Sequence, residues 1–171
     1  MKKINIVIST ALLLLFIGSC TPPPDTDADL RHVDQTLDQL NLMAANADFY
    51  TYFELFTPDA VFIGTDATEH WDKKSFMEWA KPRFDEKKTW HFESIDRHIY
   101  FNKTLDFAWF DELLKTRMKI CRGSGVLIKQ NNKWKIQQYV LSMTIPNSLT
   151  DTVVKIKTTV EDELIKKLDV K

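Results

Sequence analysis

The chain has 171 residues, of which 44% are hydrophobic and 27% are charged, and its formal net charge at pH 7 is −1. This length and composition suit one domain with a sizeable hydrophobic core. The balance of charges excludes the strongly basic surface that announces a nucleic-acid-binding protein, so we expect no nucleic-acid partner.

The N-terminal segment has the layout of a secretory signal peptide. Lys2 and Lys3 precede an apolar run over residues 4–17, and the small residues 18–19 follow it. The run is shorter than the roughly 18 apolar residues that a membrane-spanning helix needs. We therefore predict a signal peptide over residues 1–19.

The residues that follow indicate a lipid anchor. Residues 17–20, Ile-Gly-Ser-Cys, resemble the bacterial lipobox, in which the cysteine is lipidated and becomes the mature N-terminus. The alternative is a disulfide between Cys20 and Cys121. Residues 20–29 are rich in proline and acid, which is typical of an extended tether and favours lipidation of Cys20, with Cys121 left as a buried thiol. Because Thr21 rather than an acid follows, analogy with enteric bacteria places the anchored protein in the cell envelope, at the outer membrane.

Helices are predicted for the first part of the mature chain. Apolar residues recur every three or four positions from Leu30 to Ala47, which predicts an amphipathic helix. A short aromatic helix over residues 49–56 is expected to start after Asp48 and to end at Thr57-Pro58. A third helix is expected between Asp72 and Pro82. The sequence therefore predicts three N-terminal helices before the long strands begin.

A change of periodicity marks the start of a sheet. Residues 60–63 predict a short strand, and aromatic and β-branched residues predict four long strands, at residues 89–101, 105–118, 122–130 and 133–145. Helices followed by such a meander predict an α+β fold, with one curved antiparallel sheet covered by helices on one face. Residues 148–171 predict an extra C-terminal amphipathic helix, whose narrow apolar stripe could dock on the domain or on a second copy.

Three stretches of the sequence carry a family resemblance. The runs ELFTPDAVFIGTDATEHWDKKSFMEW, FAWF and RGSGVLIKQNNKWKIQQYVLSMTIPN together resemble the SnoaL-like branch of the nuclear-transport-factor-2-like superfamily, over about residues 30–147. The resemblance implies a cone-shaped fold whose open end often holds a small, largely apolar ligand. It also implies where the ketosteroid isomerases of the superfamily carry their two acids. Those positions fall on or near Gly64 and on the strand with Arg122 and Ser124, so both acids are missing and isomerase activity is disfavoured.

Four other residues are candidates for proton transfer, namely Asp66, His98, Asp111 and Glu112. Because Asp111 and Glu112 are neighbours on a strand, one of them should point into the cone. There it would either form an ion pair, with Arg117 or Arg122, or have its pKa raised by desolvation. A structural ion pair across the strands is the favoured interpretation. The histidines do not converge as metal ligands do, so we expect no metal and no cofactor.

The predicted ligand pocket is aromatic. Its candidate walls are Tyr52, Trp71, Trp109 and Tyr139. The sequence leaves three hypotheses: a lipid-tethered, non-catalytic domain that binds a small apolar or amphipathic molecule, an enzyme of isomerase or hydro-lyase type with a relocated acid-base residue, or a dimerisation module that uses the outer sheet face or the C-terminal helix. The first is favoured because the known catalytic acids are missing.

Overall fold

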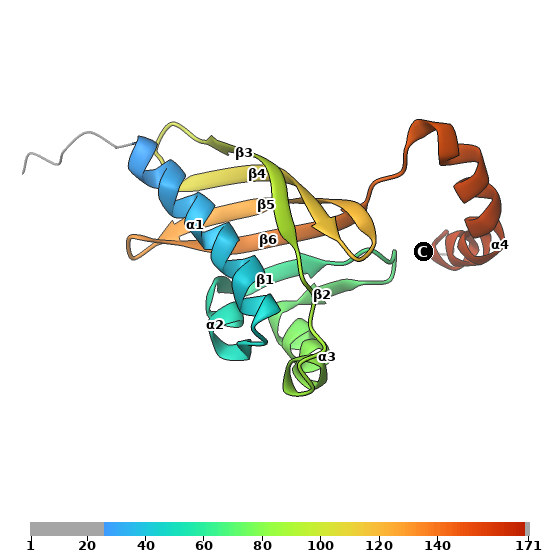
Figure 1. The fold of residues 1–171 in the computed structure, drawn as a ribbon, viewed down its shortest axis with the longest axis horizontal. Helices are drawn as coiled ribbons and strands as arrows, with labels where there is room; N and C mark the ends of the chain where they lie inside the picture. Colours follow the sequence, from blue (N-terminus) through green and yellow to red (C-terminus); the bar gives the residue numbers. More distant parts are fainter. Residues whose placement is uncertain (1–25, 170–171) are drawn as a thin grey trace, which may run out of the picture.

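A curved six-stranded sheet runs through the molecule (Figure 1). The structure, a computed structural model, describes residues 26–169. The strand order is β2-β1-β6-β5-β4-β3, and all neighbours are antiparallel except β1 and β6, which are parallel. The strands are β1 (Phe56–Ile63), β2 (His70–Asp72), β3 (Glu93–Phe101), β4 (Phe107–Thr116), β5 (Lys119–Gln130) and β6 (Lys133–Met143). The predicted α+β class and curved sheet are confirmed.

Every predicted strand differs from its expected bounds, most of all β1 and β3, and β2 lies where no strand was predicted. The sequence predicts that Thr57-Pro58 ends the second helix, but these residues belong to β1. The N–H of Ile136 donates to the carbonyl of Leu55 at 2.9 Å, so β6 draws this segment into the sheet. Proline is tolerated there because the pairing of β1 with β6 is irregular at this point. Residues 89–92 are not a strand either, since Trp90 packs its ring against Phe76 and Phe84 of the helical layer.

Three helices pack on the inner face of the sheet. They are α1 (Thr26–Ala45), α2 (Phe49–Glu54) and α3 (Lys73–Asp85), and Figure 1 shows α1 lying across the strands. The helix α1 buries a stripe of apolar residues, and its first turn is held by Asp29, which accepts hydrogen bonds from Lys129 Nζ at 2.7 Å and Trp134 Nε1 at 2.9 Å. The prediction that residues 20–29 form a tether is therefore wrong for residues 26–29, because a tertiary contact makes them helical.

Alternation along β4 separates core from surface. Ala108, Phe110, Glu112 and Leu114 are buried on the inner face, whereas Phe107 and Trp109 are exposed on the outer face. The same alternation continues across the ladder, where Phe110 lies opposite Gly125 and Gly125 opposite Tyr139. The core therefore lies between the inner face and the three helices, as the α+β prediction requires.

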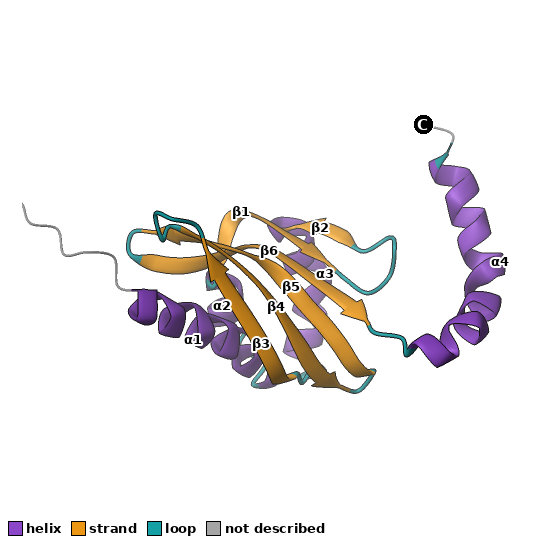
Figure 2. Cartoon of the chain, turned by 90° about the horizontal axis from the view of Figure 1, so that it is seen from above, coloured by secondary structure: helices purple, strands orange, loops and turns teal. Residues whose placement is uncertain are grey.

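The C-terminal helix α4 (Thr150–Leu168) stands apart from this core (Figures 1 and 2). A single turn of 3₁₀ helix, η1 (Asn147–Leu149), links it to the end of β6. No residue of α4 is buried, and apolar side chains such as Ile156 and Val160 are about three-quarters exposed, at 75% and 73%. The predicted extra helix is present, but it contributes nothing to the hydrophobic core.

Candidate functional site

A cavity of about 690 Å³ opens at the end of the sheet where β1 and β6 finish and β5 begins. Four segments surround it: the β1–β2 hairpin, α3, the loop that leads into β3, and the β4–β5 turn. Its apolar lining includes Phe62, Trp71, Phe76, Trp79, Trp90 and Met118. This volume lies within the range of small-molecule binding sites, about 300–1,000 Å³.

Flat aromatic rings form the floor of this cavity. The rings of Phe62 and Phe76 stack with centroids 4.0 Å apart and an angle of 15° between their planes. Trp71 continues the stack, at 5.7 Å and 14° from Phe76. The helix that carries Phe76 is positioned by its N-cap, because Asp72 Oδ1 accepts a 2.7 Å hydrogen bond from the N–H of Ser75. Ring stacking and the helix cap therefore fix the relative positions of these floor residues.

The residues predicted as pocket walls fall in three different places. Trp71 lines the cavity. Tyr52 and Tyr139 are buried to 1% exposure in the core behind the lining, where Tyr139 stacks on Phe62 with centroids 5.6 Å apart. Trp109 is 42% exposed on the outer face, so its prediction as a wall is wrong. Strand alternation excludes it, since its neighbour Phe110 faces inward.

Of the proton-transfer candidates, three lie at the surface. Asp66 is exposed in the β1–β2 turn, where its carboxylate accepts hydrogen bonds from the N–H and hydroxyl of Thr68, and these bonds lower its pKa. His98 and Asp111 lie opposite each other on the outer face, with Nδ1 and Oδ1 3.6 Å apart. None of the three lines the cavity. Local hairpin geometry and strand alternation turn them away from it.

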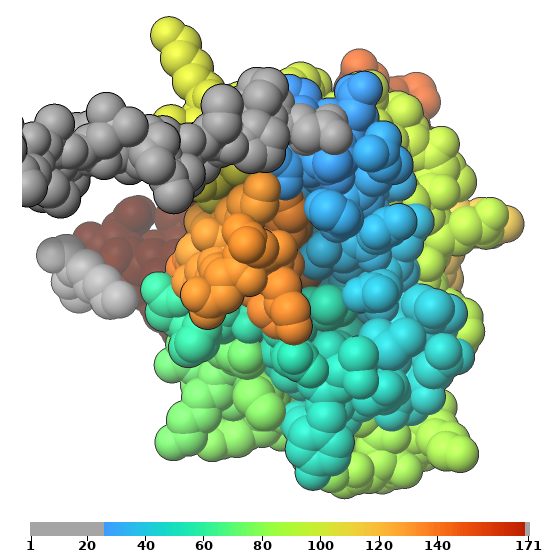
Figure 3. Space-filling view, turned by 90° about the vertical axis from the view of Figure 1, so that its left-hand side faces the viewer, coloured from blue at the N-terminus to red at the C-terminus, as the bar shows by residue number. Residues whose placement is uncertain are grey.

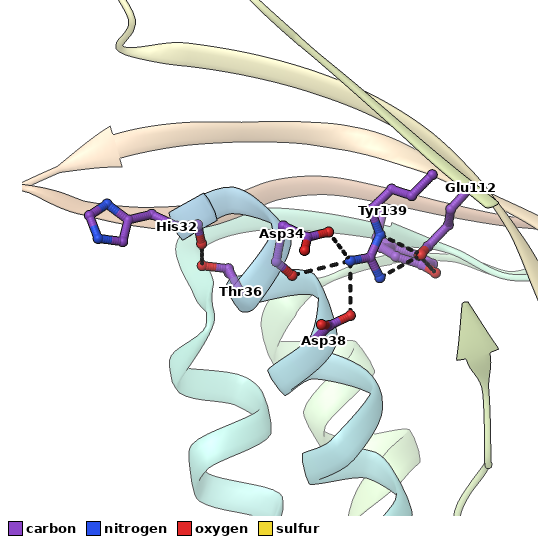
Figure 4. Close-up of polar contacts among 7 residues, drawn as sticks. His32, Asp34, Thr36, Asp38, Glu112 and Tyr139 are labelled. Atoms are coloured by element: carbon purple, nitrogen blue, oxygen red, sulfur yellow. Dashed lines mark hydrogen bonds and ion pairs between the residues drawn. The ribbon is translucent and has the colours of Figure 1, made fainter. Parts of the chain in front are cut away.

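Glu112 is the acid that points inward, and it is fully engaged in a buried network (Figure 4). Its Oε2 accepts hydrogen bonds from Arg97 Nε at 3.0 Å and Nη2 at 2.8 Å, and its Oε1 accepts one from the Tyr139 hydroxyl at 3.2 Å. Arg97 also donates to the carboxylates of Asp34 at 2.6 Å and Asp38 at 2.9 Å on α1. The favoured ion pair across the strands is thus present. Its partner is Arg97 rather than Arg117 or Arg122, because Arg97 is the residue opposite Glu112 in the ladder.

The pKa values of both hydrogen-bond partners of Glu112, Arg97 and Tyr139, lie above their ordinary values. Burial alone would lower the pKa of Arg97, but the carboxylate of Glu112 and those on α1 raise its pKa above the ordinary value. Burial and the neighbouring charge of Glu112 raise the pKa of Tyr139. Both groups therefore keep their ordinary protonation at neutral pH. Glu112 is 1% exposed and does not line the cavity, and its network ties α1 to the sheet.

One carboxylate does line the cavity, and the sequence analysis missed it. Glu69 lies in the β1–β2 hairpin, and its Oε2 accepts a hydrogen bond from the N–H of Asp66 at 3.2 Å. Its carboxylate lies against Gly64, where a β-carbon would collide with it. The pairing of the two residues, through Gly64 N–H and the Glu69 carbonyl at 2.9 Å, depends on the hairpin register. In the sequence, Gly64 is the one sign that another group could approach the backbone closely at this point.

A second, smaller hollow lies at the opposite end of the sheet. It has a volume of about 350 Å³ and lies between α1, α2 and the β5–β6 hairpin, the end of the molecule shown in Figure 3. Its lining is mostly polar, with His32, Gln35 and Gln39 from α1. Trp134 is the one tryptophan among its described lining residues, whereas three tryptophans line the first cavity, which is the stronger candidate site.

Neither a metal site nor a membrane-spanning helix is found in the part of the chain that the structure describes. Over residues 26–169, no three His, Cys, Asp or Glu side chains converge closely enough to hold a metal ion. None of the described helices is long and apolar enough to cross a membrane. Cys20, the predicted lipidation site, lies outside the described residues, and Cys121 is buried and forms no disulfide with any of them.

Comparisons with known proteins give a family from the sequence and a fold from the solved structures. Residues 33–146 match the sequence model of the SnoaL-like domain. No curated protein sequence matches. A domain of unknown function with a cystatin-like fold from Nostoc punctiforme pcc 73102 superimposes with a TM-score of 0.64 at 16% identity, covering 86% of this chain and 100% of its own.

Two further solved structures share the fold at similar distance. A candidate dehydratase of the NTF2-like family from Streptomyces avermitilis has a TM-score of 0.61 and 13% identity, covering 71% of this chain and 100% of its own. A candidate calcium/calmodulin-dependent protein kinase II association domain from Xanthomonas campestris has a TM-score of 0.54 and 20% identity, covering 74% of this chain and 94% of its own. At these identities the likeness shows a common fold alone.

Proposed function

The chain belongs to the SnoaL-like domain family, and from this premise we propose that its cavity binds a small apolar or amphipathic molecule without transforming it. The observation that carries the proposal is the aromatic cavity itself, lined by Trp71, Trp79 and Trp90 and continuous with the core through Phe62 and Phe76. Burying an apolar ligand against such rings removes a large area from water, which is the main source of affinity in pockets of this kind.

Native mass spectrometry on protein purified from a bacterial host tests this binding. We expect an additional mass that is lost on denaturation. The variant Met118→Trp, which fills the cavity from the β4–β5 turn, should abolish the additional mass, whereas the control Met143→Trp, at a position that is 53% exposed at the end of β6, should retain it. Retention of the same mass by both variants would show that the ligand does not occupy this cavity.

We also propose that the domain is tethered to the cell envelope, at the outer membrane, through lipidated Cys20. Support comes from the N-terminal sequence, in which a charged start, a short apolar run and the lipobox-like residues 17–20 follow one another. A Cys20→Ser variant should lose its acyl mass and move from the membrane fraction to the soluble fraction. If it stays with the membrane fraction, the lipid-anchor proposal is wrong.

Catalysis is the second candidate, and the position of Glu69 favours it. This is the one carboxylate among the described residues that line the cavity, so it is the group that could take a proton from a bound molecule in an isomerase or hydro-lyase reaction. The test is incorporation of deuterium from solvent into the bound molecule, measured by NMR. A proton-transfer role requires exchange that is lost in Glu69→Gln and kept in Asp66→Asn, which removes a carboxylate beside the cavity. Absence of exchange in the wild type argues for binding alone.

Self-association is the third candidate, because the outer face of the sheet exposes aromatic side chains. Tyr100 and Trp109 stack with centroids 5.7 Å apart, and both are more than two-fifths exposed. Such a patch is typical of a protein interface, here with a second copy of the chain. Sedimentation should give a dimer that Trp109→Glu dissociates. A second measurement without residues 150–171 would show whether the C-terminal helix takes part. A monomer at all concentrations would exclude the homodimer.

A further inference from the structure

The cavity carries an excess of positive charge at its rim. Arg83, Lys88, His91 and Arg117 line it, and Glu69 is the carboxylate among the described lining residues. Arg83, Lys88 and Arg117 are three cations against one anion, although the whole chain has a formal net charge of −1. A cleft lined by one sign of charge raises the local concentration of ligands of the opposite sign. The excess is therefore a local property of this site.

Arg83 is held at the rim in a fixed orientation. Its guanidinium carbon lies 3.8 Å from the centroid of the Trp79 ring, and its Nη1 donates a hydrogen bond to the Trp79 carbonyl at 2.9 Å. This stacking leaves several guanidinium N–H groups available. Within residues 26–169, neither Arg83 nor Arg117 forms an ion pair with a carboxylate, whereas Lys88 pairs with Glu86 at 2.9 Å. The two arginines are therefore the cations best placed to meet an incoming anion.

The two arginines and the carboxylate reach the cavity from three different segments. Arg83 lies in the last turn of α3 and Arg117 in the β4–β5 turn, whereas Glu69 comes from the β1–β2 hairpin. A negative group beside Glu69 would be repelled, while a carboxylate or sulfonate can accept two hydrogen bonds at once from a guanidinium group. The aromatic lining, with Trp71, Trp79 and Trp90, is the apolar surface on which the rest of the molecule would lie.

We propose that the ligand of this cavity is a flat apolar molecule with a single anionic group, such as a carboxylate or sulfonate, which Arg83 and Arg117 bind. This inference rests on the proposed binding function and adds the chemical class of the ligand. It also orients the ligand, with the anion at the rim and the ring system against Trp71 and Trp79.

Two fluorescent probes with the same rings separate charge from apolar burial. Anilinonaphthalene sulfonate is an anion, and N-phenylnaphthylamine has the same ring system without the sulfonate. With the full chain we expect the anion to bind at least about tenfold more tightly at low salt, and this advantage should shrink as salt screens the exposed arginines. The double variant Arg83→Gln/Arg117→Gln should lose the advantage and keep its affinity for the neutral probe.

A matched control removes the same charge elsewhere. The variant Arg31→Gln/Arg122→Gln changes two exposed arginines that do not line the cavity, so both probes should bind it as they bind the wild type. Any probe that binds outside the cavity, including to the apolar N-terminal residues, is expected to bind both double variants equally. The difference in affinity between the two variants therefore reports binding in the cavity.

The outcomes distinguish a wrong ligand class from a cavity that binds no ligand. If both probes bind equally and the cavity double variant changes neither affinity, the ligand class is wrong although the pocket binds apolar rings. If Met118→Trp leaves the binding of both probes unchanged, the cavity is not a binding site and the proposed function fails with it.

Discussion

Replacing Glu112 by Gln is the most direct test of what the buried network does. The change preserves size but removes the charge that faces Arg97, whose side chain is only 8% exposed. Loss of one partner of a buried ion pair costs about 3–5 kcal/mol. Asp34 and Asp38 still neutralise Arg97, and glutamine can still accept one hydrogen bond, so we expect a smaller loss of unfolding free energy, about 2–3 kcal/mol.

The assay is urea and thermal denaturation followed by circular dichroism and tryptophan fluorescence. The loss should lower Tm by roughly 5–10 °C for a domain of this size. Asp111→Asn is the matched control, because it removes a carboxylate from the next residue of the same strand, on the outer face, where its side chain is 45% exposed. The control should cost less than about 0.5 kcal/mol. Equal stability of the two variants would refute the view that the Glu112 network holds α1 to the sheet.

Three further predictions concern stability. A β-carbon at position 123 would lie 2.5 Å from the Tyr139 hydroxyl, so Gly123→Ala should break its buried hydrogen bond and lower the unfolding free energy by about 1–3 kcal/mol in urea titration, whereas Ser124→Ala on the outer face should change it little. Burial raises the pKa of Tyr139, so the stability it contributes is complete below the tyrosine pKa of the unfolded chain, about 10, and is lost as pH rises through its folded pKa. Stability should therefore fall less steeply in alkali for Tyr139→Phe, and parallel curves would contradict this. Deleting residues 150–171 should leave Tm unchanged in dilute solution, because no residue of α4 is buried; a large fall would reveal packing that α4 makes elsewhere.

The elements were predictable where local patterns are strong. The apolar spacing of α1 and the alternation of β4 are visible in the sequence, and they led to the α+β class and to the expectation that either Asp111 or Glu112 points inward. Local patterns failed where a distant segment decides the conformation. Thr57-Pro58 becomes strand because β6 pairs with its neighbour Leu55, and residues 26–29 are helical, with Asp29 held by Lys129 and Trp134 from the far side of the sequence.

The candidate site shows the same division. Trp71 was predicted as a wall and lines the cavity, but nothing local indicates that Trp79, Trp90 and Arg117 would join it. Trp109 was predicted as a wall on the same grounds as Trp71, but its side chain lies on the outer face of the sheet. One step along a strand reverses the direction of a side chain, and the sequence does not show which face is the inner one.

The sequence by itself determined the order of the helices and long strands and the presence of an inward carboxylate on β4, since these depend on periodicity within short segments, and its motifs carried the resemblance to the family. Only the tertiary structure decided that Glu112 is that carboxylate, that Arg97 neutralises it, and that Glu69 and the two rim arginines face the cavity instead. Each of these depends on strand register and on which segments meet at one end of the sheet. Such contacts join residues far apart in the chain, and no local pattern encodes them.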